Sequence, residues 1–302
     1  MSKADSIKTR LLRFAVQSGK SNEYIQTHYF IERLLHRLSV SRYANDFVLK
    51  GGLLLHAMLD NRARATRDID MLAQHINNTP EQMFDVFREI CSIQLDDGIS
   101  FDLGNITAEV IIDNADFSGV RIKIICFLDK SRSIVQFDIG FGDKVVPNPE
   151  RMVYPSLLDT DDTNLLDTDD TNLLVYSKES VIAEKFQAMV SLAEANSRMK
   201  DLYDVAMLAS SYDFDGAVLR EAIAQTLKRR ATPMHDEPIV FSDTYAKDTN
   251  KQIQWSAFIK RAKVIKASLE DELAIIRTFI HPIYQAILQE NEFPLTWSHA
   301  DR

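Results

Sequence analysis

Hydrophobic residues recur every three to four positions through much of residues 1–46. Between Tyr24 and Leu38 they share one face of a predicted helix. Residues 47–49 (Phe-Val-Leu) form a short apolar run that suits a strand, and a helical pattern resumes over 53–59. Residues 68–72 (Asp-Ile-Asp-Met-Leu) then alternate polar and apolar side chains, which is typical of a half-buried strand. The first part of the chain is therefore predicted to mix helices and strands.

A further helix is predicted from Thr79 to about Ile93. Thr79 can cap this helix, Pro80 fits its first position, and Gln82 can close a capping box. Residues 129–132 (Asp-Lys-Ser-Arg) are expected to form a hairpin turn between two strands. Three strands are predicted in this part of the chain, at 107–112, 119–128 and 133–141.

The later pattern favours an α+β chain in which helices follow the strands. Prolines 147, 149 and 155 are expected to end the strand-rich half, and the pattern is mostly helical from Ser177 onward. The octamer LLDTDDTN occurs twice without a mismatch over 157–172. It lacks the turn glycine and the distal glutamate of a calcium loop, so we interpret it as a solvated loop made by tandem duplication. The predicted parts are residues 1–155 with the N-terminal helices, an acidic loop at 156–174, and an α-helical domain at 175–302.

Composition narrows the class of protein. Apolar residues make up 45% of the 302 residues, enough for a sizeable core, and no apolar run is long enough to span a bilayer. The N-terminus carries charges where a signal peptide needs an apolar stretch, so we expect a cytoplasmic protein. Cys91 and Cys126 lie far apart inside apolar runs and are expected to be buried free thiols.

Charge is unevenly distributed along the chain. The net charge of −9 argues against a protein that coats nucleic acid without specificity. Residues 1–67 nevertheless hold 12 Lys and Arg against 5 Asp and Glu. This basic third fits a local phosphate-binding face, and it equally fits an ordinary solvated helix surface.

A glycine pair follows the first predicted strand. Residues 50–52 (Lys-Gly-Gly) stand between that strand and a helix. Glycine lets the backbone approach a phosphate, and a helix N-terminus favours an anion. A plain turn would use the same residues without any such function. Lys50, Gly51 and Gly52 are therefore candidate nucleotide-binding residues.

Two carboxylates are expected to project together from the next strand. Asp68 and Asp70 are two residues apart, so in a strand they point to the same face. Like charges held so close repel each other, and a divalent cation between them relieves the repulsion. The adjoining loop carries Arg64, Thr66 and Arg67, which are expected to lie near a bound triphosphate. Together these residues predict a site for metal-assisted phosphoryl chemistry.

Asp138 lies within an apolar strand pattern at 134–140. An aspartate there is expensive to bury unless it is paired or bound to a metal. If its strand lies beside the Asp68 strand, Asp138 supplies a third metal ligand. The alternative is an aspartate on a solvated face near the strand end, where Gly140 and Gly142 follow.

These motifs in this order resemble the AbiEii/AbiGii family of abortive-infection nucleotidyltransferase toxins. The similarity is carried by residues 47–52 (FVLKGG), 66–70 (TRDID) and 137–143 (FDIGFGD), and by the downstream segments 176–186 and 196–204. It spans about residues 25 to 260. Gly52 is a departure, because nucleotidyltransferases of this fold usually carry serine there; backbone N–H groups remain available to contact a phosphate.

The resemblance implies a polymerase-β-like nucleotidyltransferase fold and a bacterial phage-defence toxin with a cognate antitoxin. It implies a reaction that uses Mg²⁺ or Mn²⁺ and transfers nucleotides from a nucleoside triphosphate to RNA, in characterised relatives the 3′ end of tRNA. By motif match, Asp68, Asp70 and Asp138 are the metal ligands. Lys185 would hold the triphosphate, Asp201 would be an essential acid, and Arg198 would assist binding.

Residue patterns alone leave alternatives open. Lys185 follows a helical apolar pattern and needs an anionic partner, which is either a triphosphate or a neighbouring carboxylate such as Glu184 or Asp201. The acceptor is either RNA or a protein or small molecule. A catalytically inactive binding module with the same fold is a further alternative, and the glycine at 52 favours it.

Overall fold

A computed structural model describes residues 2–59, 63–114, 117–142, 145–158, 170–264 and 267–301. Most of the duplicated octamer, together with Arg62 and Asp143, lies outside the described residues. Contacts between residues divide the chain into two compact units. Unit 1 contains residues 1–57, 66–143 and 150–175; unit 2 contains 58–65, 144–149 and 176–302.

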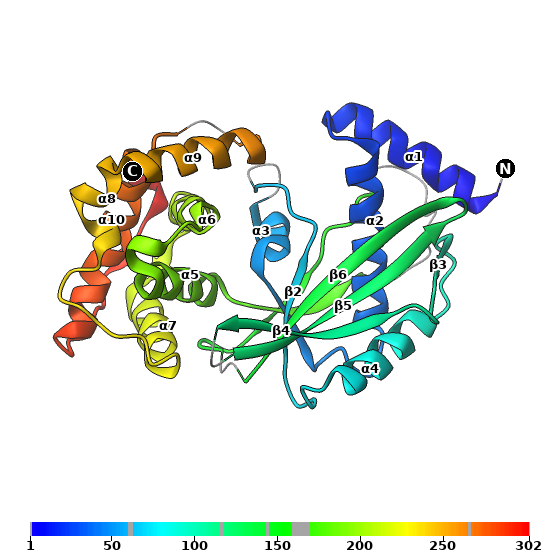
Figure 1. Cartoon of the computed structure of the whole chain (residues 1–302), viewed down its shortest axis with the longest axis horizontal. Helices are drawn as coiled ribbons and strands as arrows, with labels where there is room; N and C mark the ends of the chain where they lie inside the picture. The colour runs from blue at the N-terminus through cyan, green and yellow to red at the C-terminus, as the bar shows by residue number, and fades with distance from the viewer. Residues whose placement is uncertain are drawn as a thin grey trace. The chain divides into compact units, whose positions relative to one another are not determined.

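Unit 1 is built on a mixed sheet of eight strands (Figure 1). The strand order is β3-β5-β6-β2-β1-β8-β7, and β4 also pairs with β5. Strands β2 and β6 are parallel, as are β1 and β8, whereas the other pairs are antiparallel. The strands are β1 (Phe47–Lys50), β2 (Ile69–Ala73), β3 (Ile99–Phe101), β4 (Thr107–Asn114), β5 (Phe117–Leu128), β6 (Ser131–Phe141), β7 (Glu150–Val153) and β8 (Asn172–Val175).

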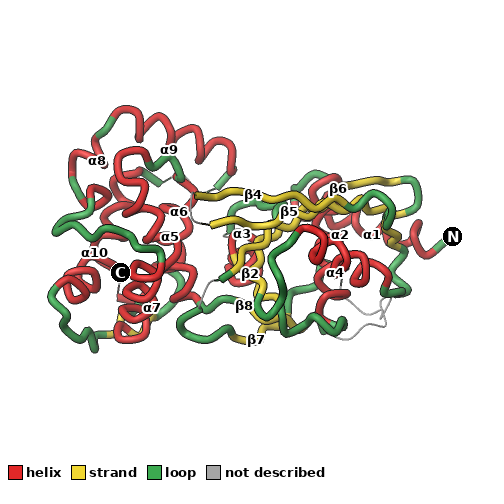
Figure 2. The backbone as a smooth tube through the Cα atoms, turned by 60° about the horizontal axis from the view of Figure 1, so that its bottom comes forward, coloured by secondary structure: helices red, strands yellow, loops and turns green. Residues whose placement is uncertain are grey.

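Helices cover one face of this sheet, and the burial of side chains along β6 alternates accordingly. Val135, Phe137 and Ile139 are buried, and the residues between them are partly exposed. The ring of Phe87, from a helix, packs against Phe137 with centroids 4.7 Å apart. Figure 2 shows β4, β5 and β6 side by side, with α2 and α4 on one side of them. The helices of unit 1 are α1 (Lys3–Ser18), α2 (Asn22–Ser39), α4 (Pro80–Ser92) and the start of α3 (Gly51–Leu59).

Unit 2 consists mainly of helices around an aromatic core. The ring of Phe186 packs against Phe241 and Tyr284, with centroids 5.7 and 5.6 Å away. Its α-helices are α5 (Lys178–Leu192), α6 (Met199–Ala209), α7 (Gly216–Arg229), α8 (Asp243–Lys247), α9 (Thr249–Ala262) and α10 (Leu269–Leu288). Its shorter elements are η2 (Ala193–Ala195), η3 (Ile239–Phe241), η4 (His299–Asp301) and the paired strands β9 (Phe214–Asp215) and β10 (Thr296–Trp297).

The predicted mixture of helices and a mixed sheet is confirmed, and two local predictions are wrong. The prolines after 146 do not end the strand-rich half, because β7 and β8 follow them and join the sheet. The hairpin turn contains only Asp129 and Lys130, since Leu128 already pairs with Ser131. Cys91 and Cys126 are buried free thiols, as predicted. Among the described residues, no helix is long and apolar enough to cross a membrane.

Candidate functional site

The acidic residues of the predicted site lie on adjacent parallel strands of unit 1. Asp70 of β2 is the register partner of Asp138 of β6. Register partners in neighbouring strands are about 4.8 Å apart and face the same side of the sheet. Asp68 is exposed and stands one residue before β2, two residues from Asp70. In extended backbone this spacing carries its side chain to the same face.

A glycine allows the strand β1 to approach Asp70 closely. Lys50 is the register partner of Asp70, and Gly51 follows with a φ of +69°. A Cβ atom on Gly51 would lie 2.0 Å from Oδ2 of Asp70, a distance that real Cβ atoms do not reach. Only glycine therefore fits between the end of β1 and the Asp70 carboxylate. Gly52 is buried in the first turn of α3.

Asp138 has two partners that the sequence pattern did not reveal. Arg121 of β5 donates from Nε to Oδ1 at 2.8 Å and from Nη2 to Oδ2 at 2.9 Å. Gln136 donates to the same two oxygens at 3.2 and 3.3 Å. The hydrogen bond with Asp138 is the main cause that raises the pKa of Arg121, and the charge of Asp68 adds to it. Arg121 is thus a counter-ion shared by the acidic face.

The hairpin register explains why Arg121 escaped sequence reasoning. With a two-residue turn, Arg121 stands directly opposite Asp138. A turn of four residues, as predicted, would instead have placed Lys123 opposite that aspartate. The usable signal was the turn itself, because its length sets the register of every pair in a hairpin.

The donor chemistry of this face fits a divalent cation of the magnesium type. Such cations prefer carboxylate oxygens. Asp70 and Asp138 share one side of the sheet, and the charge of Asp68 acts on the same Arg121 that binds Asp138. In their present positions, however, no three His, Cys, Asp or Glu side chains of the described residues are gathered as a metal site. Asp138 is instead bound at both oxygens by Arg121. A cation that binds Asp138 therefore competes with this guanidinium.

The two loop residues before Asp68 are bonded to helix α2. The carbonyl oxygen of Thr66 lies 2.9 Å from Nε2 of His28. Arg67 donates to Oε1 of Glu23 at 2.9 Å in an exposed ion pair. Both residues were predicted to lie near a triphosphate; in this structure they tie the loop to α2.

The remaining predicted residues meet in unit 2 around a buried lysine. The ammonium group of Lys185, on α5, lies 2.8 Å from Oδ1 of Asp201 and 2.8 Å from Oδ2 of Asp204, both on α6. Arg64 donates from Nε and Nη2 to Asp204 at 3.1 Å. Arg198 Nε lies 2.6 Å from Oδ2 of Asp201, within ion-pair distance but without the alignment of a hydrogen bond.

Electrostatics keep this cluster ionised. Burial alone would lower the pKa of Lys185, but the charges of Asp201 and Asp204 outweigh burial and raise it. Burial would likewise raise the pKa of Asp201, and the charges of Lys185 and Arg198 lower it instead. Lys185 is therefore a buried ammonium ion that two carboxylates bind.

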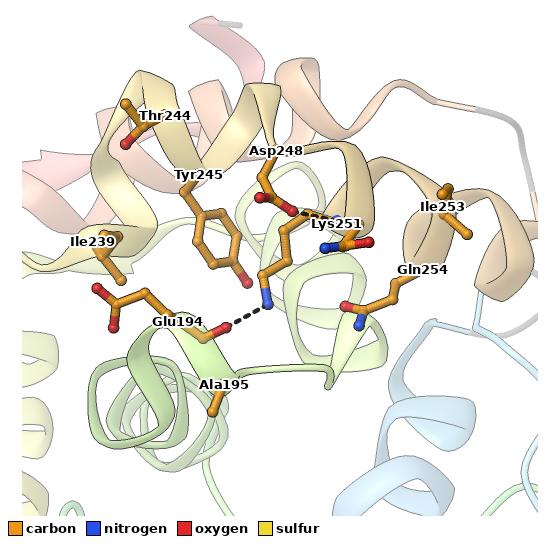
Figure 3. Close-up of a pocket in the computed structure, with 10 residues that line it drawn as sticks. Glu194, Ala195, Ile239, Thr244, Tyr245, Asp248, Lys251, Ile253 and Gln254 are labelled. Atoms are coloured by element: carbon orange, nitrogen blue, oxygen red, sulfur yellow. Dashed lines mark hydrogen bonds between the residues drawn. The ribbon is translucent and has the colours of Figure 1, made fainter.

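A pocket of about 680 Å³ lies elsewhere in unit 2, between η2 and α9 (Figure 3). Its lining includes Lys251, whose ammonium group donates to the carbonyl oxygens of Glu194 and Asn196, each at 2.7 Å. Asn196 stands two residues before Arg198. The pocket contains none of the predicted site residues, but its wall fixes the segment that leads to Arg198.

Comparison with known proteins gives one match to a family. The family model described as "Nucleotidyl transferase AbiEii toxin, Type IV TA system" matches residues 33–273. No curated protein matches the chain. Among solved structures, JHP933 from Helicobacter pylori aligns with 14% identity and a TM-score of 0.47, over 89% of this chain and 95% of that one. A candidate nucleotidyltransferase from H. pylori aligns with 14% identity and a TM-score of 0.48, over 90% of this chain and 100% of that one.

Proposed function

Because the chain belongs to the AbiEii family of nucleotidyl transferase toxins of type IV toxin–antitoxin systems, we propose that it transfers nucleotides from a nucleoside triphosphate to the 3′ end of tRNA in phage defence. The family is one of nucleotidyltransferases and implies both nucleoside triphosphate use and an antitoxin partner. The acceptor and the cation, Mg²⁺ or Mn²⁺, are our proposals. Unit 1 would be the polymerase-β-like part, and unit 2 the helical domain that follows it.

One observation carries the proposed chemistry. Asp70 and Asp138 are register partners on adjacent parallel strands, and Gly51 lies against Asp70. We propose Asp68, Asp70 and Asp138 as the cation-binding residues. A divalent cation bound there would offset the charge of the triphosphate and of the departing pyrophosphate. The terminal hydroxyl of the acceptor would form a bond to the α-phosphorus as the bond from that phosphorus to the pyrophosphate oxygen breaks.

Each unit, taken by itself, carries cationic residues that are candidates for binding a triphosphate. In unit 1 the candidates are Lys50, opposite Asp70, and Arg121 once Asp138 has exchanged partners. In unit 2, the charges of Asp201 and Asp204 keep Lys185 an ammonium ion, and by motif match it is the candidate for contact with a phosphate oxygen. We propose that Asp201 holds Lys185 in place and that Arg198 assists. The resemblance of the motifs to the family is our reason for proposing RNA as the acceptor.

The test is transfer of label into RNA. The purified protein is incubated with Mg²⁺, total bacterial RNA and each labelled nucleoside triphosphate in turn. We expect label in a tRNA-sized band, lost with EDTA and lost in the Asp68→Asn/Asp70→Asn double variant, whose side chains keep their size. That variant should retain the circular dichroism spectrum of the parent.

Other outcomes would redirect or overturn the proposal. Label that persists in the double variant would contradict the assignment of the carboxylates. Label in protein rather than RNA would contradict the tRNA acceptor and favour a protein target. Absence of both transfer and cation-dependent triphosphate binding would favour an inactive binding module.

A further inference from the structure

A histidine of helix α2, supported by a neighbouring tyrosine, holds the backbone of one residue in the loop before β2. Tyr24 and His28 stand one helical turn apart, with ring centroids 4.2 Å apart, and both are buried. Nε2 of His28 lies 2.9 Å from the carbonyl oxygen of Thr66. Helix α2 therefore holds this peptide through His28, whose ring packs against that of Tyr24.

The contact requires a proton on Nε2, because the carbonyl oxygen of Thr66 can only accept. Burial, aided by the neighbouring His56, lowers the pKa of His28 to about 4. Lys20 and Arg67 lower it further, whereas the Thr66 carbonyl raises it. At neutral pH the ring therefore holds one proton, and the carbonyl of Thr66 accepts it as a hydrogen bond.

The same histidine also contacts the helix that begins at the glycine pair. Its ring meets His56 of α3 edge-on, with centroids 5.1 Å apart. Helix α3 starts at Gly51, which lies against Asp70. His28 thus contacts both segments that flank the acidic face. It contacts the loop before β2 through Thr66, and it contacts α3 through His56.

We propose that His28 and Tyr24 are positioning residues, which fix the entry of β2 and thereby the place of Asp68 relative to Asp70. This inference rests on the proposed role of those two aspartates. Only Arg67 separates Thr66 from Asp68, so a shift of the Thr66 peptide carries over to the Asp68 carboxylate. Small displacements of catalytic groups have large effects, because reacting geometry tolerates little error.

The test compares two histidines of the same helix. His28→Leu removes the donor to Thr66, and His28→Gln keeps a donor at a similar reach. The matched control is His36→Leu. His36 is also buried on α2, and its Nδ1 lies 3.1 Å from the hydroxyl of Thr171, at the start of β8.

Two measurements are made on the full-length protein without nucleotide: hydrogen exchange of the amides of residues 66–70, and Mn²⁺ affinity by electron paramagnetic resonance. In His28→Leu we expect exchange about fivefold faster and Mn²⁺ binding about fivefold weaker, the effect of one lost hydrogen bond. His28→Gln should restore both values. His36→Leu should lower the melting temperature without changing either value.

Equal exchange in parent and His28→Leu would overturn the proposal, as would faster exchange at 66–70 in His36→Leu. The same is true if His28→Gln behaves like His28→Leu. If the parent protein binds no Mn²⁺, the proposed role of the aspartates fails. Hydrogen exchange then still decides whether α2 fixes this segment.

Discussion

Gly51 lies too close to Asp70 to accept a side chain. For Gly51→Ala we expect nucleotidyl transfer to fall by about 100-fold or more, because the added Cβ would lie 2.0 Å from the Asp70 carboxylate and displace it. The control is Gly142→Ala, at a φ of +77° with no atom within 4 Å of the added Cβ. It carries similar backbone strain, about 1–2 kcal/mol, without the contact. Transfer rates and melting temperatures measure both variants; an equal loss of transfer would show that strain alone is responsible.

Arg121 competes with any cation for Asp138. In Arg121→Gln we expect Mn²⁺ to bind several-fold more tightly, because the competing guanidinium is gone. Thermal stability without metal should change little, since both partners are partly exposed and such pairs are worth about 0–1 kcal/mol. The control is Lys123→Gln, which removes a cation that pairs with Glu109. Calorimetric titration with Mn²⁺ measures both, and equal tightening would indicate general charge rather than competition at Asp138.

Sequence reasoning reached the residues whose chemistry is visible in their own type and spacing. Asp68 and Asp70 are separated by the period of a strand, and the glycine pair follows a short apolar run. Arg121 and His28 carry no such local signal, because each acts on a residue more than 15 positions away. Their roles depend on register and on helix packing, which only the folded chain supplies.

At the scale of elements, α2 is the organising helix of unit 1. Its buried Arg33 and Arg37 both bind Asp97, which is fully buried, with contacts of 2.6 to 3.1 Å. For Asp97→Asn we expect unfolding free energy to fall by about 3–5 kcal/mol, because two buried cations lose their counter-charge. Urea denaturation at pH 7 measures this loss. A loss below about 1 kcal/mol would show that the arginines find other partners.

The contacts of Arg33 and Arg37 with Asp97 also predict that the stability of the protein depends on pH. Burial would raise the pKa of Asp97, but the bonds from Arg37 and Arg33 outweigh it and lower the pKa below the ordinary value of about 3.9. A lowered carboxylate pKa contributes stability that is complete above pH ~4 and is lost as the pH falls below it. The stability gap between the parent and Asp97→Asn should therefore narrow from pH 4 downward. A gap that stays constant from pH 7 to pH 3 would contradict this linkage.

Elements whose own residues carry a capping signal were predictable. Elements that depend on pairing with a distant segment were not. Helix α4 begins at Pro80 with Thr79 as its cap, as the capping pattern indicated. Strand β8 escaped prediction because its four residues gain their place by pairing with β1, which lies more than 120 residues earlier. Short strands of this kind carry too little pattern of their own.

At the scale of the whole chain, one copy of the repeated octamer can be deleted while the other copy stays intact. Removing residues 159–166 leaves one copy and keeps Leu158, whose carbonyl binds Arg10, and Thr171, which binds His36. If the segment is a loop, as its sequence predicts, shortening it changes the free energy of loop closure by less than about 1 kcal/mol. We expect transfer activity and melting temperature to match those of the parent. A large loss of activity would assign a function to the second copy.

Strand order also has a consequence for synthesis of the protein. Strand β8 lies between β1 and β7, so the sheet of unit 1 lacks two of its strands until residue 175 has been made. At bacterial rates of roughly 5–20 residues per second, the ribosome needs about 9–35 s to reach that point. Every nascent chain that ends between residues 138 and 174 carries Asp68, Asp70 and Asp138 on an incomplete sheet. A message cut upstream of the Val175 codon therefore yields no chain that can complete it.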